Sequence, residues 1–522
     1  MSIPLEDERI DRFTILIEEA SRSTDEGIKF FVEPASGVLS RAKSKRHHFV
    51  FGRRGSGKSS LIAKVEQELT LERTPVARVD LEPFKGHSYP DLLISVLLAT
   101  IGSFQKWLET YATVPATKTS LWTKVFGAKP TGSPLKKEAV AELVTRLKKE
   151  LVDLETQLYM TDQAEVQIES EQEEAASKET KIDVKVSSHG VSAGVGQSKT
   201  STSNNADRAK ESFKRAKVDF LRRRVLVYQK IFDDLKTIAG CDAYLLLDDL
   251  YHIRRAEQAS VVDYMHSIGK GHGMWLKVGT IRHRSTWYVH ENPPVGMKLG
   301  DDADEINLDL TLEKYRTTKD FLVKILSRLL TECDLKSTQF LTDGTIDRLV
   351  IASGGVARDF LGILRRSIAF ARERDNLENR PRVGAEDVNM AAGEYDSTKR
   401  DEFKKDTYSD EEIALQITFD RVRDFCLDTA NSNCFLVEQS ATGPEIDSLN
   451  ELVDLKLLHR IRSRVTVNTA TQKGKLFEAY MLDLSQYSAS RKRRGLEIIE
   501  FWTPGSELKL RKASLIFATK AK

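Results

Sequence analysis

The sequence predicts an α/β protein in which helices flank a parallel sheet. Three short apolar runs, His48–Phe51, Ala243–Leu247 and Met274–Thr280, have the length and continuity of buried parallel strands. Segments with helical spacing of apolar residues lie between such runs, and strands that alternate with helices form parallel sheets. A glycine-rich turn also follows the first run directly, which predicts an unusual backbone conformation at the end of that strand.

The other elements of the core follow in chain order. Val76–Leu81 is predicted as a second strand, Pro90–Phe104 as a buried helix and Ile306–Leu310 as a last strand. Residues 312–400 have helical spacing throughout. We therefore expect an all-helical part after the sheet.

Residues 113–235 interrupt this alternation. Residues 161–205 within them are poor in large apolar side chains, and a second helical stretch follows. We expect an inserted antiparallel helical hairpin with a flexible tip, which either packs within the chain or binds a partner. Spacings of four and three residues, typical of a coiled-coil seam, separate the apolar residues Val140, Val144, Leu147, Leu151, Leu154 and Leu158.

The composition is that of a soluble globular protein, with 40% hydrophobic and 30% charged residues. The four cysteines form no CxxC pair, which argues against a zinc site or a disulfide framework and fits a reducing cytosol. No apolar run approaches the roughly 18–20 residues of a membrane span, and the polar N-terminus is not a signal peptide. We therefore expect a cytoplasmic protein that has no membrane partner.

The turn at residues 52–59 has the pattern GxxxxGK[ST] of a phosphate-binding loop. Its glycines let backbone N–H groups approach phosphate oxygens, and the following helix directs its positive N-terminus at the same anion. Lys58 would lie at the β- and γ-phosphates of ATP, and the Ser59 hydroxyl would ligate Mg²⁺. The predicted nucleotide-binding residues are Gly52, Arg53, Arg54, Gly55, Ser56, Gly57, Lys58, Ser59 and Ser60.

A magnesium–nucleotide site also needs an acid on a neighbouring strand. Asp248 and Asp249 follow the apolar run Leu245–Leu247 and meet this need. We assign Asp248 to the metal shell and Asp249 to orienting or deprotonating the attacking water. A turn or cap at the strand end is the alternative.

The phosphate-binding loop, the paired acids and the later elements together resemble an AAA+ ATPase of the origin-recognition or initiator branch. The resemblance covers roughly residues 25–110 and 235–400. Gly354-Gly355 followed by Arg358 is similar to the second sensor of that family, an arginine that reaches the γ-phosphate from a helical lid. ATP would then clamp the lid to the core, and hydrolysis would release it.

The same resemblance implies two further roles. Thr280 is at the position of the polar residue that senses the γ-phosphate in that family. Arg282 and Arg284 are at the position of its arginine finger. Ordinary surface salt bridges are the alternative for both arginines. A finger that acts on a neighbouring subunit implies a homo-oligomer.

Charge is distributed unevenly near the end of the chain. Residues 401–450 carry 12 acidic and 4 basic side chains, whereas residues 451–522 carry 15 basic and 7 acidic ones. Residues 445–458 have helical spacing and run into an alternating segment, which resembles the winged-helix domain of the initiator branch. Such a domain binds either duplex DNA or protein. The predicted contacts, mainly to DNA phosphates, are Arg460, Arg462, Arg464, Lys473, Lys475, Arg491, Lys492, Arg493 and Arg494.

One departure from the initiator branch widens the choice of function. Asp249 stands where most of that family has glutamate, so slow hydrolysis remains open. The Asp-Asp pair also resembles the STAND signalling ATPases, although their lid normally has a Gly-x-Pro turn. Three functions follow: an ATPase that acts on DNA in replication, transposition or defence, a STAND-like ATPase that oligomerises with a protein trigger or effector, or a nucleotide-gated scaffold.

The predicted parts are a nucleotide-binding core (1–112 and 236–311), the hairpin (113–235), a helical lid (312–400) and a winged-helix-like domain (401–522).

Overall fold

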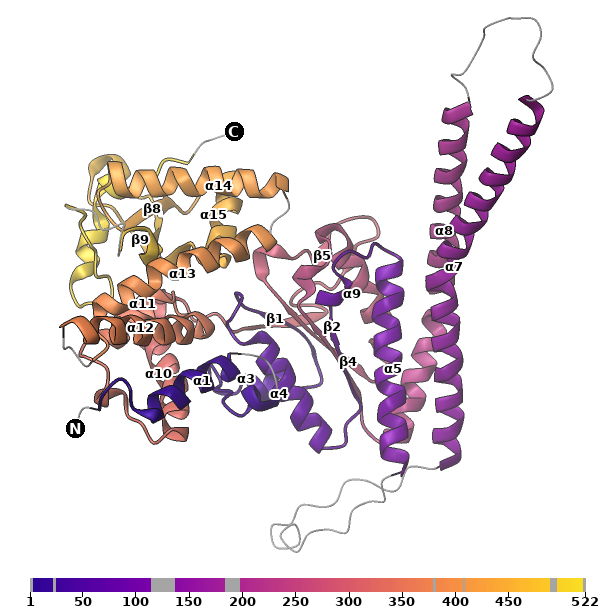
Figure 1. The fold of residues 1–522 in the computed structure, drawn as a ribbon, viewed down its shortest axis with the longest axis horizontal. Helices are drawn as coiled ribbons and strands as arrows, with labels where there is room; N and C mark the ends of the chain where they lie inside the picture. The colour runs from indigo at the N-terminus through magenta and orange to yellow at the C-terminus, as the bar shows by residue number, and fades with distance from the viewer. Residues whose placement is uncertain are drawn as a thin grey trace, which may run out of the picture.

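A computed structural model of the chain describes residues 3–21, 25–113, 137–183, 198–378, 382–406, 409–488 and 495–519. At its centre is a five-stranded sheet in the order β2-β3-β4-β1-β7, in which every pairing is parallel (Figure 1). The predicted α/β class is confirmed. The strands are β1 (His47–Phe51), β2 (Val76–Asp80), β3 (Ala243–Asp248), β4 (Met274–Thr280) and β7 (Ala303–Asn307).

The last strand begins and ends three residues earlier than predicted. β7 pairs with β1, and its Asn307 lies opposite Phe51, the final residue of β1. The Leu308 N–H still donates to the Phe51 carbonyl oxygen at 2.8 Å, but β1 ends there and the pairing with β7 goes no further. The chain continues as an irregular segment that brings Asp309 to the phosphate-binding loop.

Two sets of helices cover the two faces of the sheet. Alternate strand residues point to opposite faces, so Val50 packs with α3 (Val38–Ala42) and α4 (Lys58–Leu71), whereas Phe49 and Phe51 point to the other side. The second face is covered by α5 (Asp91–Thr113) and α9 (Arg255–Gly269), together with the inserted helices described next. Short elements complete this part: α2 (Asp25–Ile28), β5 (Tyr288–Val289) and β6 (Val295–Gly296).

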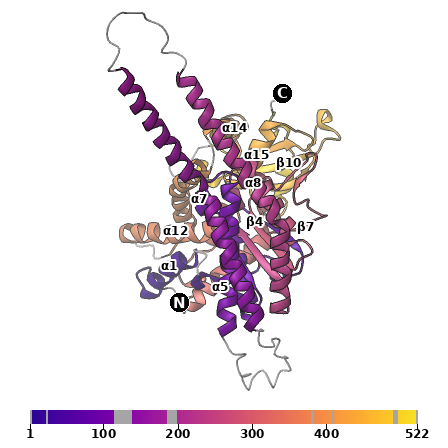
Figure 2. The ribbon, with the colours of Figure 1, turned by 90° about the vertical axis from the view of Figure 1, so that its right-hand side faces the viewer.

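The insertion forms two long helices, α7 (Lys137–Asp183) and α8 (Ser198–Ala239), whose far ends project beyond the rest of the molecule (Figures 1 and 2). Their near ends belong to the core, because the predicted seam residues Val140, Leu147 and Leu154 are buried in the cluster that contains α5. The helices also extend far into the stretch expected to be mobile, since its Glu, Lys, Gln and Ala residues favour helix. Residues 184–197, within the stretch 161–205 that was predicted to be flexible, lie outside the described residues.

The helix α5 is apolar over a longer stretch than was predicted from the sequence. Within the described residues, Asp91–Tyr111 is the one helical segment long and apolar enough to cross a membrane, and 61% of that window is buried inside the protein. Its leucines pack between the sheet and α7. This agrees with the predicted buried helix.

The helical part after the sheet consists of α10 (Tyr315–Glu332), α11 (Thr345–Ala352), α12 (Ala357–Glu378) and α13 (Ala385–Asp406). We call these four helices the lid. α1 (Glu8–Ala20), which the sequence analysis grouped with the core, packs with the lid instead, and its Phe13 ring lies 6.0 Å from Phe340.

The C-terminal part has a three-stranded antiparallel sheet in the order β8-β10-β9. The predicted helix at residues 445–458 ends at Asp454, and a strand begins at Leu458. One hydrophobic cluster runs through both the lid and this sheet, so the two parts share a core. The elements are α14 (Ser409–Asp424), β8 (Cys434–Glu438), α15 (Pro444–Asp454), β9 (Leu458–Val465) and β10 (Phe477–Leu482).

Candidate nucleotide-binding site

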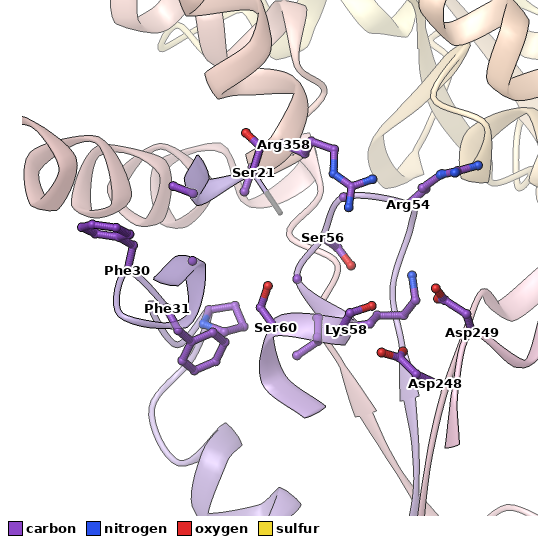
Figure 3. Close-up of a pocket in the computed structure, with 18 of the residues that line it drawn as sticks. Ser21, Phe30, Phe31, Arg54, Ser56, Lys58, Ser60, Asp248, Asp249 and Arg358 are labelled. Carbon is purple, nitrogen blue, oxygen red and sulfur yellow. The ribbon is translucent and has the colours of Figure 1, made fainter. Parts of the chain in front are cut away.

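A cavity of about 370 Å³ lies between the carboxyl end of the sheet and the lid (Figure 3). Several parts of the chain line it: the phosphate-binding loop, β2 and the end of β3, the segment that follows α1, Leu308 after β7, and the lid helices α10 and α12. The cavity therefore lies where parallel α/β sheets generally bind ligands.

The loop has the backbone that its glycines predict. Gly55 and Gly57 have φ angles of 87° and 98°, in the left-handed region that favours glycine. A Cβ atom on Gly52 would lie 2.2 Å from Ser56 Oγ, and one on Gly55 would lie 2.8 Å from Arg358 Cβ. Side chains at these positions would collide with the loop itself and with the lid.

Lys58, the first residue of α4, is buried at the floor of the cavity. Its Nζ donates to the carbonyl oxygens of Gly52 at 2.9 Å and Arg53 at 3.3 Å, and it lies 5.5 Å from the Tyr251 ring centroid. Burial lowers the pKa of Lys58, while the carboxylates of Asp249 and Asp248 act in the opposite direction. An anion at the loop would therefore stabilise the charged ammonium.

Asp248 was predicted on the strand next to β1. It lies one strand further away, at the end of β3, because β4 lies between β1 and β3. Gly279 of β4 makes the longer reach possible: a Cβ atom there would lie 2.9 Å from Asp248 Oδ1 and 2.8 Å from Ile62 Cδ1. Asp248 consequently passes over β4 to the start of α4, where the Ser59 hydroxyl acts to lower the pKa of its carboxyl.

Asp248 is suited to metal binding by its surroundings. Burial, together with the charge of Asp249, raises its pKa to about 6. Its Oδ1 atom is buried without a hydrogen-bond partner, as is Ser56 Oγ. Within the described residues no group of three His, Cys, Asp or Glu side chains could hold a metal. A carboxylate with a serine hydroxyl nonetheless suits Mg²⁺, which keeps water ligands and shares phosphate oxygens with its substrate.

Asp249 and Arg358 complete the cavity from opposite sides (Figure 3). Asp249 has a φ of 57°, an uncommon value for a residue other than glycine, and this turn lets its side chain lie near Lys58. Arg358 follows the turn Gly354-Gly355, whose φ angles are 57° and 82°. The Arg358 backbone N–H donates to the carbonyl of Gly55 at 3.3 Å, so the lid contacts the phosphate-binding loop directly.

Three residues with predicted roles lie away from the cavity. Thr280 is fully buried, and its hydroxyl bonds with that of Ser285. The Arg282 guanidinium lies 4.1 Å from the Phe51 ring centroid and pairs with Glu305, and Arg284 shares the same short turn. None of the three lines the cavity. Their roles as sensor and finger remain predictions.

Several cavity residues were missed from the sequence. Arg78 and Asp80 lie at the end of β2, and an Arg78 nitrogen is 3.4 Å from Asp248 Oδ2. They could have been found, because the carboxyl ends of parallel strands meet at one edge. Phe30 and Phe31 line the opposite end of the cavity, and no motif marks them.

The predicted DNA-binding arginines of β9 do not alternate regularly against β10, because Arg460 lies opposite Tyr480 and Arg462 lies opposite its neighbour Ala479. Several of these residues also have acidic partners. Arg460 pairs with Glu478 at 3.7 Å, and Arg462 pairs with Glu507. Arg464 is exposed. Beyond β9, Lys475 pairs with Glu438 at 2.9 Å, Lys473 is exposed, and Arg491, Lys492, Arg493 and Arg494 lie outside the described residues.

The helix that precedes β9 faces inward. On α15, Glu451 lies 3.4 Å from Arg255, and Asp454 accepts the backbone N–H of His283 at 3.1 Å. The turn that carries Arg282 and Arg284 is thus held by the C-terminal part.

Comparison with solved structures shows distant similarities. The chain is similar to the Walker-type ATPase PABY2304 of Pyrococcus abyssi, with 12% identity, a TM-score of 0.39 and coverage of 86% of this chain and 91% of that one. It is also similar to the ORC1 protein of Aeropyrum pernix in complex with DNA, with 11% identity, a TM-score of 0.32 and coverage of 92% of this chain and 90% of that one. A third similar structure is Cdc6p from Pyrobaculum aerophilum, with 11% identity, a TM-score of 0.30 and coverage of 86% of this chain and 88% of that one. No protein-family model and no curated protein matches the chain.

Proposed function

We propose that the protein binds and hydrolyses ATP with Mg²⁺ and acts as an AAA+ switch of the initiator type. The convergence of Lys58, Asp248, Asp249 and Arg358 on one cavity carries this proposal. These residues come from three places in the sequence, and together they have the charges that a metal–triphosphate needs.

The roles of the side chains follow from their positions. Backbone N–H groups of the loop and the Lys58 ammonium bind the phosphates, while Ser59 and Asp248 hold Mg²⁺, which would neutralise charge that develops on the phosphoryl oxygens. Asp249 orients the attacking water and accepts its proton. Arg358 contacts the γ-phosphate from the lid, so the lid position depends on whether ATP or ADP is bound.

The test is a titration of purified protein with ATP, ADP and GTP, with and without Mg²⁺, followed by measurement of phosphate release. We expect magnesium-dependent binding of ATP and slow release of phosphate. A protein with no magnesium-dependent affinity for any of the three nucleotides would contradict the proposal. An Asp249→Asn variant that still binds ATP but no longer hydrolyses it would support the proton-accepting role.

We further propose that the exposed cations around β9 bind duplex DNA through its phosphates. Exposed ion pairs are weak, so phosphate can displace Glu478 or Glu507 from the neighbouring arginines. Arg464 and Lys473 are exposed and add positive charge nearby. Binding that weakens steeply with salt and depends on ATP would support this proposal. Oligomers triggered by a protein, without DNA affinity, would favour the STAND-like alternative.

A further inference from the structure

Arg53 belongs to the phosphate-binding loop, yet its side chain points away from the cavity. Only 4% of the side chain is exposed. Its guanidinium donates to the carbonyl oxygens of Leu310 and Gly354, each at 3.1 Å, and lies 3.3 Å from Asp309, which also accepts the Arg53 backbone N–H. Arg53 thus joins the loop to the chain after β7 and to the glycine turn of the lid.

His459 of β9 contacts the same glycine from the C-terminal part. A Cβ atom on Gly354 would lie 2.1 Å from His459 Cε1 and 2.3 Å from its Nδ1, so the ring packs directly on the glycine. The ring is held in place from behind: His459 Nε2 bonds with Asp483 at 2.8 Å, and Asp483 pairs with Lys399 of α13 at 2.6 Å.

Charge in this buried cluster is balanced. Burial lowers the pKa of His459, so the ring is neutral and donates from Nε2 to Asp483. Burial acts to raise the pKa of Asp483, but Lys399 and His459 outweigh it and hold that pKa well below its usual value. The cluster is therefore a lysine–aspartate ion pair with a neutral histidine, which fixes the ring orientation.

Gly354 is connected to the cavity through Gly355 and Arg358, which follow it in the chain. Gly355 is close-packed, because a Cβ atom there would lie 2.6 Å from the Leu310 carbonyl oxygen. Arg358 follows three residues later, in the first turn of α12. A displacement of the glycine turn would therefore move Arg358 relative to the phosphate-binding loop.

We propose that Arg53 and His459 are positioning residues that hold Gly354 from two sides and thereby set the reach of Arg358 into the nucleotide cavity. Through His459, the C-terminal part regulates how strongly the site discriminates ATP from ADP. This inference rests on the proposed nucleotide-binding function.

The test is a double-mutant cycle on nucleotide discrimination, read as the ratio of the Kd values for ADP and ATP in the presence of Mg²⁺. The variants of the full chain are Arg358→Ala, Arg53→Gln and their combination. We expect Arg358→Ala to reduce the ratio by about 10-fold or more, since it removes a charge-assisted hydrogen bond. Arg53→Gln should cause most of the same loss, and the double variant should be no worse than Arg358→Ala. Losses that multiply would overturn the inference.

His459→Gln is run through the same cycle with Arg358→Ala, and Arg53→Lys replaces Arg53→Gln if the latter does not fold. Lysine keeps the charge but not the two-pronged donor geometry, so we expect it to lose discrimination as well. A matched control is Arg374→Gln, which breaks a lid ion pair with Asp387 (2.9 Å) away from Gly354. It should leave the ratio unchanged.

The outcomes separate the two proposals. If the control changes the ratio as much as Arg53→Gln does, general loosening of the lid is the cause, and the positioning role is wrong. If wild-type protein binds neither nucleotide, the proposed function itself fails. If it binds both with the expected preference but the losses multiply, only the inference fails.

Discussion

The phosphate-binding loop and strand β9, which carries Arg460, Arg462 and Arg464 and is called the arginine strand below, were both predicted from short runs of residues. They differ in how far the rest of the fold changes the surroundings of those residues. The loop lines the cavity, and Lys58, Asp248, Asp249 and Arg358 all lie at that cavity. On β9, Arg460 and Arg462 have acidic partners from other segments. A site made of contiguous backbone N–H groups is therefore determined locally. A charged surface depends on which acids the rest of the fold brings to it.

The largest expected effect is on the loop. Lys58→Ala should reduce ATP hydrolysis on the order of 10²- to 10³-fold, because it removes a preorganised cation from the transferred phosphoryl group. Phosphate release under saturating ATP measures the effect. Arg464→Ala, on the other side of the comparison, should leave the rate in the absence of DNA unchanged. Equal effects of the two variants would break the distinction between the regions.

The glycine turn between the two regions should be the next most sensitive. Gly354→Ala should lower the free energy of unfolding by about 2–4 kcal/mol, because it adds a left-handed backbone penalty to overpacking against His459. Gly344→Ala is the matched control in the lid: its φ is 80°, but nothing lies near its Cβ position, so only about 1 kcal/mol is expected. Chemical denaturation measures both, and a similar cost for the two variants would contradict the packing seen at His459.

The docking of α15 should depend on pH through Asp454. Burial, with the charge of Asp309, raises its pKa from 3.8 to about 7, against the opposing effects of the His283 N–H, Arg53 and Lys58. The folded state thus binds this proton more tightly than the unfolded state. Its contribution to stability is fully present below pH 3.8 and is lost as the pH rises towards 7.

We expect this group to lower the free energy of unfolding by about 2 kcal/mol between about pH 5.5 and about pH 7. The difference between wild type and Asp454→Asn, measured by denaturation across that range, isolates it, since asparagine does not titrate. Parallel curves for the two proteins would show that Asp454 does not carry the effect.

The smallest effects are expected on β9. Arg464→Ala should weaken DNA binding a few-fold and reduce the slope of log affinity against log salt by about 0.9, the value for one phosphate contact. Glu507→Gln should strengthen binding, because it releases Arg462 from its acidic partner. Titrations of duplex DNA at several salt concentrations measure both. If Glu507→Gln has no effect, the acid does not limit the arginine strand.

Much of the fold could be predicted because the patterns are local. β4 has the predicted bounds, and β1, β2 and β3 begin or end within one residue of theirs. β7 was displaced because its end depends on where its partner β1 ends. Residues 161–183 were read as mobile because their few apolar residues suggested no packing, although their composition favours helix.

The candidate site divides in the same way. Lys58 and Asp248 were identified because a motif and a strand end mark them. Arg78, Phe30 and Phe31 were missed because they join the cavity only through folding. Arg53 was assigned to the nucleotide because of its place in the motif, whereas its guanidinium bonds the lid. No sequence pattern indicates which way a loop side chain will point.

By itself, the sequence determined the parallel sheet, the phosphate-binding turn and the acids at the end of β3, because each depends on the conformation and burial of adjacent residues. The tertiary structure alone decided that Gly279 lets Asp248 reach Ser59 across β4 and that α15 packs against the turn at His283. It also decided that Arg53 and His459 meet at Gly354. These contacts join residues 31 to 301 positions apart. Only the packing of the whole chain brings them together, and no local pattern records it.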